Sequence, residues 1–230
     1  MTINAMFRPI EILLVEDSES DISLTEEAFK EGKDIHAATA ARVFNVPLEE
    51  VSREQRSHAK AVNFGIIYGQ SAFGLAQNLG ISRTEAKTII DSYFEQYPGI
   101  KTYMEESIAF ARDHGYVETL MKRRRYLPDI TSNNAVVRGF AERNAINAPI
   151  QGTAADIIKL AMIRVQNAMK KEQLKSRLLL QVHDELVFDV EKEEKERMEA
   201  LVRQEMEHAI EFAVPLTVEA EFGYNWLDAH

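Results

Sequence analysis

Four side chains between residues 56 and 68 have the types and the spacing of a nucleotide-binding surface. They are Arg56, Lys60, Phe64 and Tyr68. A spacing of four residues places all of them along one face of a helix. Two cations near a helix N-terminus, where the backbone dipole is already positive, suit a triphosphate, and the two rings could stack on a sugar and a base. The alternative is a solvated helix whose aromatic rings pack in the core.

A second polar group lies between two strand-like runs. Residues 177–182 and 186–190 are apolar and are separated only by His183, Asp184 and Glu185. This spacing predicts a tight β-hairpin with acidic groups at its tip. Carboxylate oxygens are the ligands that a hard divalent cation prefers. Taken alone, the same string is also typical of a plain polar hairpin tip.

Composition sets the frame for these groups. The chain has 230 residues, of which 45% are hydrophobic and 28% charged, and it has no cysteine. Disulfide scaffolds, thiol catalysis and Cys-ligated zinc are therefore excluded. No apolar run approaches the ~20 residues of a membrane helix, and the N-terminus lacks the layout of a secretory signal, so we expect an intracellular protein without a membrane partner.

The net charge of −10 is unevenly distributed along the chain. Residues 35–190 carry 20 basic and 17 acidic groups, a net charge of +3, and the acidic excess lies toward both ends. The local field matters more than the total charge for a polyanionic partner. The charge of the middle of the chain is therefore compatible with a nucleic-acid partner. Its densest basic cluster, residues 122–125, is either a solvated loop or a contact to the DNA backbone, and we favour the contact.

The periodicity of the chain predicts an α/β protein with more helix than strand. Residues 10–15 form an apolar run typical of a buried parallel strand, followed by a helix to about residue 30. Helices are predicted from Ser52, from the capping box Ser82–Glu85 and from Pro98 to His114. Further segments are predicted as a hairpin or loop (117–130), two helices or one helix broken at Pro149 and Gly152 (133–171), a helix (193–212) and a strand (216–222).

Four strings, in order, resemble motifs of the family A DNA polymerases of bacteria. They are Arg56 to Gly69 (R-x3-K-x3-F-x3-Y-G), Asp34 to Ala40, Glu142 to Asp156 (ER…INAPIQGTAAD) and Gln181 to Glu185 (QVHDE). The resemblance runs from about residue 30 to the C-terminus. It implies a fold of mostly helical fingers with part of an antiparallel palm sheet. It also implies template-directed DNA synthesis in replication and repair, in the bacterial cytosol, with primer–template DNA and deoxynucleoside triphosphates as partners.

The resemblance assigns a role to each matching residue. The triphosphate would contact His36, Arg56 and Lys60, while Phe64 would lie against the deoxyribose and Tyr68 near the templating base. The minor groove of the new duplex would contact Arg143, Asn147 and Gln151, where donors can test pairing without reading sequence. The catalytic Mg2+ would bind Asp184, supported by Glu185, with His183 near the primer end. Lys60, Asp184 and Glu185 would then be the catalytic residues.

One expected residue is missing. Two-metal catalysis in this family uses a second aspartate, on a strand reading roughly D-Y-S-Q-I-E-L-R. When Ile10 and Glu11 are taken as the I-E of that motif, the aspartate position falls at Met6. A thioether is a poor ligand for Mg2+, so we expect nucleotidyl transfer by this chain to be impaired.

Residues 10–33 resemble instead the start of a response-regulator receiver domain, with Glu16 and Asp17 as its acidic pair. The sequence therefore predicts a chimera in which residues 1–33 are a receiver-like graft and residues 34–230 are polymerase fingers and partial palm. We expect the strand of residues 10–15 to fill the vacant place beside the hairpin of residues 178–190. Two alternatives remain open: a catalytically dead module that binds nucleotide or primer–template, and a truncated receiver fragment.

Overall fold

The computed structural model describes residues 2–9, 35–44, 46–212, 216–225 and 228. The receiver-like segment of residues 10–33, with Glu16 and Asp17, lies outside the described residues, so its interpretation stays a prediction. The chain divides into two compact units. We call them the sheet unit, which contains β1 and the chain from Ile150 onward, and the helical unit, which ends at Pro149.

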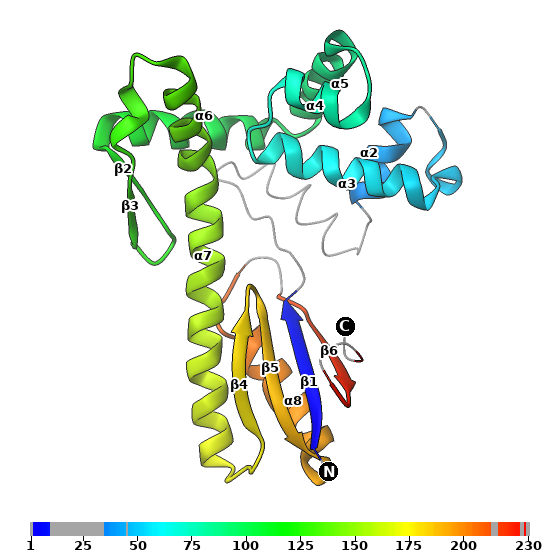
Figure 1. The fold of residues 1–230 in the computed structure, drawn as a ribbon, viewed down its shortest axis with the longest axis vertical. Coiled ribbons are helices and arrows are strands. Elements are labelled where there is room, and N and C mark those ends of the chain that lie inside the picture. The colour runs from blue at the N-terminus through cyan, green and yellow to red at the C-terminus, as the bar shows by residue number, and fades with distance from the viewer. Residues whose placement is uncertain (1, 10–34, 45, 213–215, 226–227, 229–230) are drawn as a thin grey trace. The chain divides into compact units, whose positions relative to one another are not determined.

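The sheet unit is built on four antiparallel strands in the order β4, β5, β1, β6 (Figure 1). They are β1 (Thr2–Pro9), β4 (Arg177–Val182), β5 (Glu185–Glu191) and β6 (Val218–Gly223). Two helices pack on one face of this sheet, α8 (Lys195–Glu207) and the C-terminal part of α7 (Ala135–Lys171). Alternate residues of β5, namely Leu186, Phe188 and Val190, are fully buried in that core, as the period of two in a strand requires.

The place beside the predicted hairpin is filled by residues 2–9 and not by residues 10–15. β1 pairs with β5 from Thr2↔Glu191 to Phe7↔Leu186 and with β6 on its other side. The prediction for residues 10–15 is therefore wrong in its choice of segment, and residues 10–15 themselves lie outside the described residues. The apolar run of residues 10–15 has the stronger strand pattern in the sequence. The segment TINAMFRP has a weaker one, and β1 ends at its proline, Pro9.

The helical unit contains five helices and a small hairpin among its described residues. Its helices are α2 (Ile35–Val43), α3 (Arg53–Ile67), α4 (Ala72–Leu79), α5 (Arg83–Gln96) and α6 (Pro98–His114), and the first part of α7 follows. The caps predicted at Ser52, Ser82 and Gly115 are all present. Gly115 has φ 76°, the left-handed conformation that ends α6 at little steric cost. The predicted fold class, mostly helical with a small antiparallel sheet, is confirmed.

Residues 117–130 form the predicted hairpin, followed by a 3₁₀ turn. The strands β2 (Tyr116–Glu118) and β3 (Arg124–Tyr126) pair antiparallel, and the turn is Pro128–Thr131. Val117, Leu127 and Ile130 are buried and join Ala141, Ala145 and Ala148 of α7 in a second core. The basic residues at the hairpin tip remain exposed.

One helix, α7, replaces the broken helix predicted for residues 133–171. It runs through Pro149 for 37 residues. Proline removes one intrahelical hydrogen bond and crowds the carbonyl four residues earlier, at a cost of ~3 kcal/mol. The burial of α7 residues in a core on each side of Pro149 offsets this cost. Tyr103 also donates a hydrogen bond of 2.9 Å to the carbonyl of Ile146, in the turn that precedes the proline.

Candidate nucleotide and primer–template site

The cationic end of α3 is fixed by a capping box. The Ser52 hydroxyl accepts a hydrogen bond from the backbone N–H of Gln55, and the Gln55 side chain accepts one from the backbone N–H of Ser52. Two donors that the first turn would otherwise leave without partners are thereby satisfied. Arg56 and Lys60 follow within the first two turns and are both exposed. The helix therefore presents two exposed cations in its N-terminal half, toward its positive end.

The predicted triphosphate and nucleoside residues form one continuous cluster on α2 and α3. The Lys60 ammonium lies 5.5 Å from the centre of the Phe64 ring. Phe64 stacks on Tyr68 with ring centres 5.9 Å apart and planes inclined by 21°. The His36 ring, on α2, lies 5.8 Å from Phe64. The structure thus brings together His36, Lys60, Phe64 and Tyr68, with Arg56 one turn from Lys60 on the same helix.

Asn63 is a residue of this cluster that the sequence analysis missed. Its side chain is 3% exposed, and its Nδ2 lies 2.9 Å from Nδ1 of His36. The sequence does contain a signal for it. Asn63 lies between Val62 and Ile66 on the buried side of an amphipathic helix, where apolar residues are usual.

The predicted duplex contacts lie along α7. Arg143, Asn147 and Gln151 are spaced four residues apart on this one helix, although Gln151 falls in the sheet unit. Oδ1 of Asn147 is buried and accepts no hydrogen bond from the described residues, so this amide has unused capacity. Arg143 is exposed, with its guanidinium carbon 5.9 Å from the centre of the Phe140 ring.

Gly69 explains how Arg143 lies against the end of α3. Its φ is 76°, and a Cβ added there would lie 3.2 Å from Cγ of Arg143. Glycine is therefore required twice, for the backbone conformation and for the close approach. Within the helical unit, this packing places one predicted duplex contact next to the turn that follows Tyr68.

The predicted acidic hairpin is present in the sheet unit. β4 and β5 pair up to Val182↔Glu185, so His183 and Asp184 form the turn, and both are exposed. His183 has φ 52°, a left-handed conformation that costs a non-glycine residue roughly 1 kcal/mol or more and that is frequent at functional sites. Nε2 of Gln181 donates to the carbonyl of His183 at 2.6 Å and braces the turn.

The residues around this turn fit a pair of divalent cations only in part. Asp184 and Glu185 supply carboxylates, which suit Mg2+. Within the described ranges, no group of three or more His, Cys, Asp or Glu side chains is placed to hold a metal ion. Met6, at the expected aspartate position, pairs with Val187 across the ladder. The residues that the structure describes therefore supply only part of the ligands that two cations would need.

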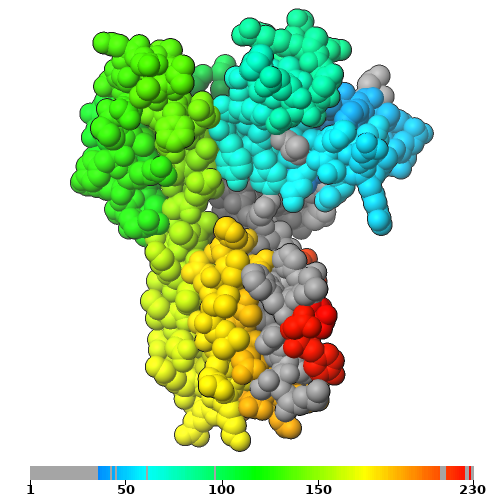
Figure 2. Space-filling view, viewed as in Figure 1, coloured from blue at the N-terminus to red at the C-terminus, as the bar shows by residue number. Residues whose placement is uncertain are grey.

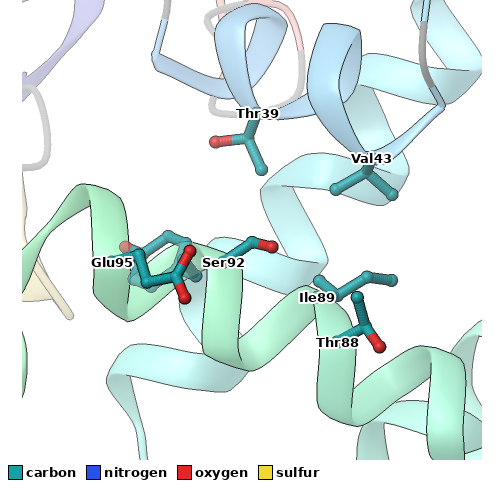
Figure 3. A pocket seen from close by; sticks show the side chains of 7 residues that line it. Thr39, Val43, Thr88, Ile89, Ser92 and Glu95 are labelled. Atoms are coloured by element: carbon teal, nitrogen blue, oxygen red, sulfur yellow. The ribbon is translucent and has the colours of Figure 1, made fainter.

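A pocket of about 560 Å³ lies between α2 and α5 and is separate from the cluster (Figure 3). It is lined by Thr39, Val43, Thr88, Ile89, Ser92, Tyr93 and Glu95. None of the predicted site residues lines it. Burial, together with the nearby Tyr97 hydroxyl, raises the pKa of Tyr93 above its ordinary value, so this phenol stays protonated.

Comparison with known proteins agrees with the predicted family. A family model described as DNA polymerase family A matches residues 2–228. The chain is 54% identical over 230 residues to DNA polymerase I of Lactococcus lactis subsp. cremoris (strain MG1363), covering 100% of this chain and 26% of that protein. It is 53% identical over 225 residues to DNA polymerase I of Bacillus subtilis (strain 168), covering 98% and 26%.

A solved structure is similar throughout the described fold. It is the POL domain of Pol1 from M. smegmatis in complex with DNA primer-template and dNTP, with a TM-score of 0.88 and 43% identity, covering 99% of this chain and 40% of that chain. The chain thus spans about a quarter of the length of the curated relatives it matches. None of these matches confirms the predicted junction near residue 33. In the described residues, no helix is both long enough and apolar enough to cross a membrane. This chain belongs to the family A DNA polymerases.

Proposed function

We propose that this chain supplies the nucleotide-binding surface and part of the catalytic surface for template-directed DNA synthesis. The reaction is nucleotidyl transfer from a deoxynucleoside triphosphate to a primer 3′ end, in the bacterial cytosol. The observation that carries the proposal is the continuous cluster of His36, Lys60, Phe64 and Tyr68 on α2 and α3. Along α3 a cation is followed by two stacked rings, and along a nucleotide a triphosphate is followed by a sugar and a base, so the two sequences of groups correspond. Family membership and the DNA-bound relative support the same activity.

Each group has a physical task in this proposal. Arg56 and Lys60 neutralise phosphate charge at the positive end of α3, and the charge that develops on the leaving pyrophosphate is stabilised there. The stacked rings of Phe64 and Tyr68 offer a flat apolar surface to the sugar and the base pair. Arg143, Asn147 and Gln151 donate to the minor groove, and His183 lies near the primer end beside Asp184.

We further propose that the chain binds its substrates better than it joins them. Two Mg2+ ions would supply charge stabilisation for the attacking and leaving oxygens in this class of reaction. Asp184, supported by Glu185, would hold one ion, but position 6 carries a methionine. The carboxylate set is incomplete at that position. A module that binds nucleotide and primer–template without extending the primer is therefore the second candidate function.

Two measurements on the purified chain test the proposal. Calorimetric titration with a deoxynucleoside triphosphate should show binding that Lys60→Ala weakens, because one phosphate contact is lost. The matched control is Lys87→Ala, which removes an exposed lysine of α5 that is paired with Asp91. Equal affinity in the wild type, Lys60→Ala and Lys87→Ala would contradict the proposal that α3 binds the triphosphate through Lys60.

Primer extension then separates the two candidate functions. A labelled primer–template is incubated with the chain, Mg2+ and all four triphosphates. We expect binding with little or no extension. Robust extension that Asp184→Ala abolishes would show that another carboxylate replaces the one missing at position 6. A phosphorylation assay with a small phosphodonor such as acetyl phosphate tests the receiver alternative, for which we expect no labelling.

A further inference from the structure

The buried hydrogen bond between Asn63 and His36 has a consequence for how the cluster meets a triphosphate. Asn63 lies within α3 beside Val62, Ala59 and Ile66, all of which are buried. A polar amide in such a place costs free energy unless it is hydrogen-bonded. Its Nδ2 meets Nδ1 of His36 at 2.9 Å, on the neighbouring helix α2.

The orientation of the Asn63 amide sets the direction of this bond. With the amide in this orientation, Nδ2 can only donate, so Nδ1 of His36 accepts and carries no proton. In a neutral imidazole the single proton then resides on Nε2. Turning the amide over would let Oδ1 accept from a protonated Nδ1. It would also place both amide N–H donors where Oδ1 now lies, and Oδ1 is buried without a hydrogen-bond donor among the described residues. In the orientation that the structure gives, Nδ2 faces His36, and we pursue the arrangement with Nδ1 of His36 as the acceptor.

We propose that Asn63 is a positioning residue, which holds His36 in the Nε2–H tautomer so that the ring offers a donor to the triphosphate. This inference rests on the proposed nucleotide-binding function. Triphosphate oxygens accept hydrogen bonds and do not donate them, so a ring with its lone pair on Nε2 would repel them. The contact between His36 and Phe64, 5.8 Å between ring centres, keeps the ring in the cluster that includes Lys60.

Two substitutions separate tautomer control from packing. Asn63→Leu removes the donor and keeps the volume. Asn63→Asp replaces the donor with a carboxylate acceptor, which favours a proton on Nδ1. The matched control is Val62→Ala, which removes buried atoms at the adjacent position of the same helix and leaves the amide in place.

Nitrogen NMR of the full chain, labelled at histidine nitrogens, reads the tautomer directly. The His36 signals are assigned by their loss in His36→Gln. In the wild type and in Val62→Ala we expect the proton on Nε2, and in Asn63→Asp a protonated Nδ1. If the wild type carries its proton on Nδ1, or if the ring signals are the same in Asn63→Leu, Asn63→Asp and the wild type, the proposal is wrong.

Titration with a deoxynucleoside triphosphate then separates this proposal from the proposed function. We expect Asn63→Leu to bind roughly three- to tenfold more weakly, the loss of about one hydrogen bond, and Val62→Ala to bind like the wild type. Asn63→Asp should also bind more weakly, because its carboxylate adds negative charge near the phosphates. Equal affinity in all four proteins, with the tautomer shifts present, would show that the amide orients the ring without serving the nucleotide. If even the wild type does not bind the triphosphate while the tautomer is as expected, the proposed nucleotide-binding function is wrong. The proposal that Asn63 sets the His36 tautomer is then still supported.

Discussion

Met6 pairs with Val187 in the ladder between β1 and β5, and Val187 lies three residues beyond Asp184 in the chain. Because β1 also pairs with β6, its register is held from both sides. Three residues of strand span ~10 Å. Two aspartate side chains with metal–oxygen bonds of ~2.1 Å can cover that distance. We therefore expect a carboxylate at position 6 to lie close enough to Asp184 to share an ion with it.

Met6→Asp should increase primer extension by this chain. The substitution supplies the carboxylate that the cation pair lacks, so labelled primer should be extended with Mg2+ where the parent chain extends little or none. The measurement is single-turnover primer extension at saturating triphosphate.

The controls for this gain are Met6→Asn and the double variant with Asp184→Ala. Asparagine has nearly the same shape as aspartate without the charge, so it reports any effect of the substitution on the strand, and the double variant should be inactive. No gain in Met6→Asp, with nucleotide affinity retained, would place the defect elsewhere in the chain.

Phe188→Ala should destabilise the sheet unit strongly. The ring is 0% exposed in the core beneath the sheet, and truncating a buried phenylalanine costs ~3–5 kcal/mol. Leu179→Ala is the control, because Leu179 lies on β4 at a register shift and is 52% exposed, so its loss should cost below ~1 kcal/mol. Figure 2 shows the segment of β4 and β5, in yellow, at the surface of this view. Urea unfolding followed by circular dichroism compares the two, and similar midpoints would contradict the assignment.

The sequence predicts local structure, such as helix starts and hairpins, better than it predicts which strands pair in the sheet. The capping boxes at Ser52 and Ser82 act within one turn, so their residue pattern suffices to predict where α3 and α5 begin. The hairpin at His183 and Asp184 is equally local. The pairing of β1 with β5 joins segments some 180 residues apart, and the apolar run of residues 10–15 looked the better strand when read alone. Which segment fills a sheet is decided by tertiary context that periodicity does not contain.

The candidate site divides in the same way. The spacing of Lys60, Phe64 and Tyr68 predicted a shared helix face, and the structure brings these side chains together. Asn63 was missed because its role depends on a partner in another helix, His36. The proline at 149 was given too much weight as a helix breaker, since burial on both sides of it outweighs one lost hydrogen bond.

Glu194→Gln should lower stability at neutral pH and have little effect in acid. The carboxylate accepts hydrogen bonds from the backbone N–H groups of Lys175 and Ser176 and from the Ser176 hydroxyl, at 2.7 to 3.0 Å. Burial opposes its ionisation, but these hydrogen bonds prevail and hold the pKa of Glu194 below its ordinary value of 4.5. Since the folded-state pKa is lowered, its stabilisation is complete above the unfolded-state pKa and is lost as pH falls through the folded-state pKa.

Urea unfolding of both proteins between pH 7 and pH 3 measures this effect. The difference in unfolding free energy should be constant near neutrality and should shrink below about pH 4.5, the ordinary pKa of the group. Glu193→Gln, one residue earlier and exposed, should show no such trend. A difference that grows in acid would contradict the sign.

Arg125→Ala in the β2–β3 hairpin should weaken primer–template binding and flatten its salt dependence. Arg124 is engaged within the hairpin, by Glu118 at 2.8 Å and by the Tyr116 ring, which leaves the exposed Arg125 pointing along the opposite face of the strand. If Arg125 contacts one phosphate, its loss should reduce the slope of log K against log salt by ~0.9. Fluorescence anisotropy from low to moderate salt provides the slope. Lys87→Ala removes the same charge from α5 and should leave the slope unchanged, so equal slopes in both variants and the parent chain would show that the basic hairpin is only a solvated loop.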